Sequence, residues 1–235
     1  MENRDPSGEM QAYLLDHQAE LLSFIIQFDE QMSRYEAAIK EICTKLEILK
    51  ADFRIHKNRD CISTIQSRIK SPASILDKLA RKGCPIDFNT MGNNLDDIAG
   101  IRVICKFIDD IYVLAEKISS QDDLVVVEVI DYIKNPKPNG YRSYHMVVEV
   151  PVFFATAKEY VRVEIQLRTV AMDFWASLEH DIRYKKDSCE CEDIVEDLKV
   201  CADTVAVADK HMMELRDKVL QKHQQRLQDG WELLP

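Results

Sequence analysis

The sequence predicts an α+β fold, in which helices flank a mixed β-sheet and a long helix lies at each end of the chain. Two observations lead to this prediction. At both ends, apolar residues recur at alternating spacings of four and three, which is typical of amphipathic helices. The middle alternates short segments rich in β-branched residues with helical segments, which is typical of a sheet packed against helices.

Each terminal helix carries one apolar stripe. The stripes consist of Tyr35, Ile39, Ile42, Leu46, Leu49 and Phe53, and of Ile194, Leu198, Cys201, Val205, Ala208, Met212, Leu215 and Val219. Such stripes normally pack against the core of their own domain. The C-terminal stripe is long and follows every other motif, so subunit contact is a second hypothesis. We therefore predict an N-terminal helical extension (1–34), a central domain (35–190) and a C-terminal helix for oligomerisation (191–235).

The elements of the middle follow from local signals. Ser71 and Pro72 predict the start of a helix, and Gly83 predicts its end. The further predicted elements are strands over 101–107, 123–133, 144–150 and 161–169, helices over 109–119 and 172–185, and a loop over 134–140. In the last of these helices we expect the buried side to consist of Phe174, Trp175, Leu178 and Ile182.

Composition narrows the class of protein. The net charge of −10 argues against nucleic acid or an anionic membrane as a non-specific partner. The N-terminus lacks a basic stretch followed by an apolar one, so no secretory signal is expected. The seven cysteines are scattered, which favours the reducing cytoplasm over a disulfide framework. Cys189 and Cys191 form a single pair, short of the four ligands of a structural zinc site, and are interpreted as free thiols.

A basic segment stands out against this acidic background. Between Thr64 and Lys82 only Asp77 is acidic, and the cations are Arg68, Lys70, Lys78, Arg81 and Lys82. A solvated helix face would explain the pattern, but so would a site for a small polyanion. The six glycines form no phosphate-binding loop, so any phosphates must be held by cationic side chains.

Two carboxylates are candidates for chemistry. Asp97 precedes the strand predicted over 101–107, where it could bind Mg²⁺ or merely cap a turn. Glu164 shares the polar face of the strand over 161–169 with Arg162 and Gln166. On that face it could orient a metal-bound water or accept a proton.

Four separated motifs carry a family resemblance. SRIKSPASILDKLARKG, DDIAGIRVICKF, NGYRSYH and VEIQLRTVAMDFWASLEH occur in this order between about Tyr35 and Lys186. They resemble the synthetase domain of RelA/SpoT homologues and, more narrowly, the single-domain small alarmone synthetases of bacteria. The resemblance implies a nucleotidyltransferase-like fold and transfer of pyrophosphate from ATP to the 3′-hydroxyl of GDP or GTP. The products would be AMP and the alarmones ppGpp or pppGpp.

The resemblance also implies roles for residues on the ATP side. It assigns ATP binding to Arg68, Lys70, Ser74, Lys78, Arg81 and Arg102. Arg68 and Arg102 would sandwich the adenine ring, and the other cations would hold the phosphates. Asp97 would be a Mg²⁺ ligand, and Glu164 would activate the 3′-hydroxyl or support the metal.

On the acceptor side the resemblance assigns GDP or GTP binding to Lys134, Lys137, Tyr141, Arg142, Tyr144, His145 and Gln166. Tyr141 or Tyr144 would stack on guanine, and Tyr141 is favoured because it follows Asn139-Gly140. His145 would meet the acceptor phosphates together with the nearby lysines and arginine.

The resemblance has limits that shape the prediction. Long family members carry a hydrolase domain with histidine–aspartate metal ligands. Here His17 and His56 have no aspartate after them, and His180-Asp181 follows the synthetase motifs, so no alarmone hydrolysis is expected. Two alternatives remain: another acceptor (a tRNA 3′ end or an adenine nucleotide), and a non-catalytic nucleotide-binding scaffold. The resemblance further implies a homotetramer built through the terminal helices, and the net charge argues against a membrane or DNA as partner.

Overall fold

A computed structural model describes residues 17–56, 59–85, 91–92, 94–184 and 192–231. Its centre is a five-stranded sheet in the order β1-β2-β5-β4-β3. The strands are β1 (Ile62–Ile69), β2 (Ala99–Cys105), β3 (Val125–Asp131), β4 (Tyr144–Phe153) and β5 (Lys158–Thr169). β2 and β5 run parallel and the other neighbours antiparallel, so the sheet is mixed, as predicted.

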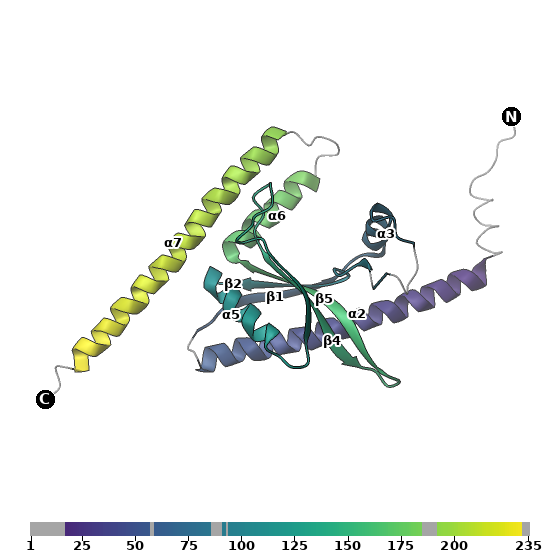
Figure 1. Ribbon diagram of the computed structural model, residues 1–235, viewed down its shortest axis with the longest axis horizontal. Helices are drawn as coiled ribbons and strands as arrows, with labels where there is room; N and C mark the ends of the chain where they lie inside the picture. The colour runs from purple at the N-terminus through teal and green to yellow at the C-terminus, as the bar shows by residue number, and fades with distance from the viewer. Residues whose placement is uncertain (1–16, 57–58, 86–90, 93, 185–191, 232–235) are drawn as a thin grey trace.

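Helices flank this sheet and extend beyond it at both ends of the chain. They are α2 (Gln18–His56), α3 (Pro72–Arg81), α5 (Ile108–Ser119), α6 (Val170–Tyr184) and α7 (Glu192–Trp231). Figure 1 shows α2 crossing the sheet along its length, with α6 and α7 side by side on the opposite side of the molecule from the N-terminal end of α2. The predicted α+β class, with a long helix at each terminus, is confirmed.

The core lies between the sheet and the two helices α2 and α5. Along β5, alternate residues from Val161 to Leu167 are buried, and the N-terminal stripe of α2 is buried from Tyr35 to Phe53. The preceding part of the same continuous helix leaves Leu22 and Phe24 exposed. Because every second side chain of β5 faces this core, the residues between them face the other side of the sheet. That second face carries the polar side chains considered below.

The helix α3 begins and ends where the sequence predicts. Ser71 accepts a hydrogen bond on its Oγ from the backbone N–H of Ser74, 3.3 Å away, and Pro72 is the first helical residue. Gly83 follows the helix with φ of 65°, a conformation that costs glycine little. The capped helix holds Lys78 in a fixed position relative to the strands.

Strand β1 was not predicted. After a register shift at its start, Ile65, Ser67 and Ile69 pair with the inward residues of β2, and Gln66 and Arg68 face the polar side. Ser67 interrupts the apolar alternation, and an edge strand has a neighbour on one side only. Periodicity therefore gave no strand signal in this segment.

The prediction for the buried side of α6 was wrong in three of its four residues. Trp175 is buried, but Phe174, Leu178 and Ile182 are 59%, 47% and 43% exposed. The helix packs instead through the neighbouring side that carries Met172, Trp175 and Ala176, because α7 and the end of β5 lie there.

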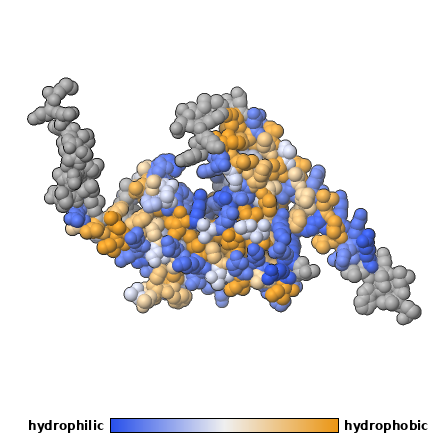
Figure 2. All heavy atoms as spheres, turned by 180° about the vertical axis from the view of Figure 1, so that it is seen from behind, coloured by the Kyte–Doolittle hydropathy of each residue, from blue (hydrophilic) through white to orange (hydrophobic). Residues whose placement is uncertain are grey.

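The C-terminal stripe likewise does not pack on the core along its length. Helix α7 packs through Leu198, Ala202 and Asp209, whereas Met212 and Leu215 are more than half exposed. Figure 2 shows apolar surface over the outer end of α2 and where α6 and α7 meet. These exposed apolar faces leave the hypothesis of subunit contact standing.

Two further sequence predictions concern membranes and thiols. Among the described residues, no helix has both the length and the apolar run that crossing a bilayer requires. Cys189 and Cys191 lie outside the described residues. The described cysteines, such as Cys61 and Cys105, are free thiols.

Candidate active site

The polar face of the sheet gathers residues from four neighbouring strands. The register places Arg102 of β2 between Gln66 of β1 and Gln166 of β5, and Gln166 beside His145 of β4. Two residues earlier in β2, Gly100 lies between Arg68 of β1 and Glu164 of β5. Since glycine has no side chain, β2 places no side chain between that arginine and that glutamate.

Two pockets open on this face, and both are lined by Asp97 and Glu164. The first extends over β1 and β2 and is lined also by Arg68, Arg102 and Gln66. The second extends over β4 and β3, and its lining includes Lys78, Lys82, His145 and Glu128. Asp97 and Glu164 thus stand where two pockets with cationic side chains meet, although the second pocket also contains the carboxylates of Asp96 and Glu128. Cations in both pockets suit two anionic molecules that react with each other.

Asp97 is held between two lysines. Its Oδ2 lies 2.6 Å from Lys70 Nζ and 2.7 Å from Lys78 Nζ. Burial disfavours the charged carboxylate, but these two hydrogen bonds outweigh it and bring the pKa of Asp97 below its ordinary value. Its Oδ1 is buried and has no hydrogen-bond partner among the described residues. A buried, ionised and unpaired oxygen is suited to bind a cation.

Glu164 is ionised for a similar reason. Burial alone would raise its pKa, but His145 Nδ1 lies 3.2 Å from Oε1, and Gln166 donates its Nε2 to Oε2 at 2.8 Å. The pKa of Glu164 is consequently below its ordinary value. The side chain is therefore a carboxylate at neutral pH, ready to accept a proton or to face a cation.

The hydrogen bonds around Glu164 close into a ring. Tyr141 Oη lies 2.8 Å from His145 Nε2. Arg168 donates its Nη2 to Tyr141 Oη at 2.8 Å and to Gln166 Oε1 at 3.1 Å. Because every member of the ring is fixed by two others, the carboxylate and the tyrosine are positioned together.

Asp173 ties this ring to the first pocket. Its Oδ1 accepts a hydrogen bond from Arg168 Nη1 at 3.0 Å and lies 3.3 Å from Arg102 Nη1. Burial and the neighbouring charge of Arg168 bring the pKa of Arg102 below its ordinary value. One carboxylate thus offsets two arginines that lie close together.

Comparison with known proteins shows to which family the chain belongs. Residues 67–189 match the sequence model of the region found in RelA / SpoT proteins. The chain belongs to the RelA/SpoT family. It is 39% identical to the GTP pyrophosphokinase YwaC of Bacillus subtilis over 203 residues, which are 86% of this chain and 97% of that protein. It is 36% identical to the GTP pyrophosphokinase YjbM of the same organism over 194 residues, 82% of this chain and 90% of that protein.

Solved structures of RelA/SpoT proteins share the fold. The crystal structure of small alarmone synthetase 1 from Bacillus subtilis bound to its product pppGpp superimposes with a TM-score of 0.75 at 34% identity, covering 83% of this chain and 98% of that one. Small alarmone synthetase 2 from the same organism gives a TM-score of 0.70 at 41% identity, covering 78% and 96%. The architecture of mixed sheet and flanking helices is therefore that of the small synthetases of the family.

Most residues expected from the RelA/SpoT motifs lie in or beside the two pockets. Arg68, Arg102 and Gln166 line the first pocket, and Lys78 and His145 line the second. Lys137 Nζ lies 5.0 Å from the centre of the Tyr141 ring and 4.7 Å from that of Tyr132. The residues assigned to catalysis and metal binding, Asp97 and Glu164, are at the junction of the two pockets.

Other expected residues lie outside the linings of these pockets. Arg81 forms an ion pair with Asp77 on its own helix, and the Oγ of Ser74 lies 2.8 Å from that of Ser71 at the helix cap. Lys134 Nζ lies 3.4 Å from Asp131 Oδ2. These three side chains are at the surface around the site rather than between its two carboxylates.

Tyr144 and Arg142 lie elsewhere. Tyr144 packs against the core and meets Tyr112 of α5 edge-on, with ring centres 5.7 Å apart, so it faces away from His145. Of the two tyrosines considered for guanine stacking, Tyr141 is thus the one on the side of the site. Arg142 Nη2 donates to Asp203 of α7 at 2.7 Å.

Arg168 and Asp173 belong to the site although sequence reasoning did not assign them to it. Arg168 shares the polar face of β5 with Glu164 and Gln166, and that alternation could have identified it. Asp173 lies in the first turn of α6, where an acidic residue is commonly a helix-terminal charge. Its role becomes visible only through its contacts with two arginines.

Proposed function

We propose that this protein is a GTP pyrophosphokinase. It would transfer pyrophosphate from ATP to the 3′-hydroxyl of GDP or GTP, releasing AMP and making ppGpp or pppGpp in the bacterial stringent response. The observation that carries the proposal is the pair of cation-lined pockets that share Asp97 and Glu164. The names of the relatives YwaC and YjbM, and the pppGpp bound to small alarmone synthetase 1, support the same reaction.

The reaction needs alignment of two nucleotides more than covalent help from the protein. The 3′-hydroxyl oxygen of the acceptor forms a bond to the β-phosphorus of ATP, and the bond from that phosphorus to the oxygen of AMP breaks. Glu164, ionised and on the boundary of both pockets, accepts the hydroxyl proton. Arg68 and Arg102 have the planar cationic groups that stack on adenine.

Mg²⁺ is the proposed cofactor. The unpaired Oδ1 of Asp97 fits a hard cation, and Asp97 and Glu164 would hold the ion where the two pockets meet. When bound, the ion supplies charge neutralisation at the transferred phosphates. Lys70 and Lys78, whose Nζ atoms lie 2.6 Å and 2.7 Å from Asp97 Oδ2, would lie beside those phosphates.

The second pocket is proposed to take the acceptor nucleotide. Tyr141 would stack on guanine, and Lys137, whose Nζ lies over its ring, would lie near the acceptor phosphates with His145. We assign the neighbouring Lys134 and Gln166 to the same nucleotide.

The proposal includes the cellular setting. We infer a cytoplasmic homotetramer assembled through the terminal helices, without membrane or DNA as a partner and without hydrolase activity. The exposed apolar side chains of α2, α6 and α7 support assembly through these helices. The net charge of −10 makes free nucleotides better acceptors than tRNA.

The test is product formation from labelled ATP and Mg²⁺, with GDP, GTP, ADP or tRNA offered in parallel and the products separated by chromatography. Asp97→Asn and Glu164→Gln should each reduce turnover about 10²–10³-fold, as expected when one transition-state contact is lost. Asp60→Asn and Glu159→Gln are matched controls, because they remove carboxylates of other ion pairs in the same domain. Near wild-type turnover in either site variant, or transfer only to ADP or tRNA, would contradict the proposal.

A further inference from the structure

The segment that carries Tyr141 is held from outside the site by α7. The backbone of this segment forms a tight turn, in which Gly140 N–H donates to Lys137 O at 2.8 Å and Lys137 N–H donates to Tyr141 O at 3.2 Å. We define residues 137–142 as the acceptor loop. Neither hydrogen bond fixes where the turn lies relative to the sheet, so its position must come from other contacts.

The first of these contacts is steric. Gly140 has φ of 86°, and a β carbon built on it would lie 2.5 Å from the Cβ of Ala202 and 3.2 Å from the Cα of Lys199. The loop backbone therefore rests directly on α7, at a distance that only a glycine facing an alanine permits. Ala202 is 4% exposed, so this contact is closed to solvent.

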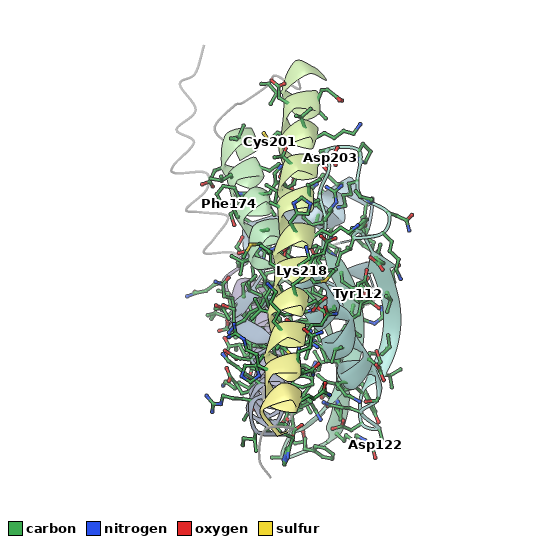
Figure 3. All side chains as sticks on the ribbon, turned by 90° about the vertical axis from the view of Figure 1, so that its left-hand side faces the viewer. Tyr112, Asp122, Phe174, Cys201, Asp203 and Lys218 are labelled. Carbon is green, nitrogen blue, oxygen red and sulfur yellow. The ribbon has the colours of Figure 1, made fainter. Side chains whose placement is uncertain are left out.

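The second contact is electrostatic. Arg142 Nη2 donates to Asp203 Oδ1 at 2.7 Å, and its Nη1 donates to Gly140 O at 3.0 Å. One guanidinium thus joins α7 to the backbone immediately before Tyr141. Figure 3 shows Asp203 on the opposite side of α7 from Cys201 and Phe174.

The third contact is apolar and involves the tyrosine itself. Tyr141 packs against a small buried cluster made of Trp175, Ala176, Leu198 and Ala202, half of which comes from α7. Trp175 also donates its Nε1 to Leu198 O at 2.9 Å, which fixes α6 against the same turn of α7. The apolar cluster against which Tyr141 packs is therefore built by α6 and α7 together.

We propose that α7 positions the acceptor loop, with Asp203 as a positioning residue that acts through Arg142 on Tyr141. The inference rests on the proposed function, since it assigns Tyr141 to the guanine nucleotide. Arg142 is then a link to α7 rather than a phosphate ligand. The acceptor site is complete only when α7 is docked, whereas the residues that line the ATP pocket lie on β1, β2 and β5 and just before β2.

The test separates the two substrates kinetically. Asp203→Ala should raise KM for GDP and GTP about twofold to fivefold, the size a partly exposed ion pair supplies, and leave kcat and KM for ATP unchanged. Ala202→Leu, which forces a larger side chain against Gly140, should raise the acceptor KM by more than Asp203→Ala does. Asp60→Ala is the matched control, because it removes another partly exposed ion pair, with Lys106, that involves neither α7 nor the acceptor loop.

A charge exchange tests the role of Arg142. In the double variant Arg142→Asp with Asp203→Arg, the acceptor KM should return toward the wild-type value if the pair only positions the loop. Failure of the exchange to improve on Arg142→Asp alone would overturn the inference, as would an equal effect of Asp60→Ala. Unchanged acceptor KM in both Asp203→Ala and Ala202→Leu would overturn it as well. A wild-type protein that makes no alarmone would instead refute the proposed function.

Discussion

Arg168 sets the direction of the hydrogen bonds around Glu164. Because Tyr141 Oη accepts a hydrogen bond from Arg168 Nη2, its own hydrogen is available to His145 Nε2. His145 then carries its proton on Nδ1, which faces Glu164 Oε1 at 3.2 Å. Gln166 is oriented in the same way, since its Oε1 accepts from Arg168 and its Nε2 donates to Glu164. Both oxygens of the glutamate therefore receive hydrogen bonds, which keeps it ionised.

Replacing Arg168 by lysine tests this ring. Lysine keeps the charge but lacks the fork that contacts Tyr141, Gln166 and Asp173 together. Arg168→Lys should lower kcat/KM for the acceptor about 10-fold to 100-fold, which corresponds to the loss of a hydrogen bond involving a charged group, about 1.5–3 kcal/mol. Steady-state kinetics with varied GDP measures this effect.

The control for that variant lies on the same strand. Arg162 shares the polar face of β5 but binds Glu149 and Asp96, outside the ring. Arg162→Lys should leave kcat/KM for the acceptor within about twofold of wild type, because exposed ion pairs contribute little. Equal losses in the two variants would mean that the ring has no special role.

At the level of elements, regular alternation made β5 predictable from sequence, and a local cap signal made the start of α3 predictable. In β5 the apolar and polar residues alternate without interruption, and Ser71-Pro72 provides a cap whose chemistry is local. In β1 the register shift and Ser67 remove the alternation, so the strand could not be recognised. Periodicity identifies regular elements and fails where an edge strand breaks the pattern.

The same limit applies to surfaces and to the site. Periodicity showed that α6 has an apolar side but not which neighbour covers it, and Phe174 proved to be exposed. For the site, the family motifs identified residues such as Asp97 and Glu164. They could not show that Arg142 is directed to Asp203, because a long side chain on a loop is oriented by a partner sixty-one residues away. Contacts of this kind depend on tertiary structure, which the spacing of residues does not encode.

The free energy of unfolding should depend on pH through Asp209 of α7. This residue is buried and accepts a hydrogen bond on Oδ2 from Thr169 Oγ1 at 2.6 Å, and Thr169 in turn caps α6. Burial raises the pKa of Asp209 above its ordinary value of 3.8, more than the hydrogen bond lowers it. The folded protein therefore binds this proton more tightly than the unfolded chain. The stabilisation that this proton provides is complete at pH values below 3.8. It is lost as the pH rises through the raised pKa of the folded protein.

Asp209→Asn removes this dependence, because the amide is neutral at every pH and its oxygen still accepts from Thr169. Thermal unfolding of the variant should occur at a higher temperature than that of wild type at pH 7. The difference should shrink as the pH falls toward about 4, near the unperturbed value of an aspartate. Asp197→Asn on the exposed side of the same helix should show no such trend. A variant less stable than wild type at pH 7 would mean that the ionised carboxylate is required.

On the scale of the whole molecule, one face of the sheet builds the core and the other builds the site. Apolar residues of β5 pack beneath α2 and α5, while the residues between them support the two pockets above. The terminal helices extend past this unit, as Figure 1 shows. Their exposed apolar side chains, such as Leu22 of α2 and Leu215 of α7, line neither pocket, so they are available for contacts between subunits.

The assembly should therefore depend on the exposed apolar side of α7. Met212, Leu215 and Val219 are 58%, 53% and 65% exposed and recur at spacings of four and three on one side of the helix. Burying a leucine side chain contributes about 1.5–3 kcal/mol, and a charge in its place would have to be desolvated. Leu215→Lys should therefore shift the protein, measured by light scattering over a range of concentrations, from its oligomer toward smaller species. Glu196→Lys adds the same side chain at another exposed position of α7 and should leave the mass unchanged. An oligomer that survives Leu215→Lys, or a wild-type protein that is already monomeric, would place subunit contact elsewhere or exclude it.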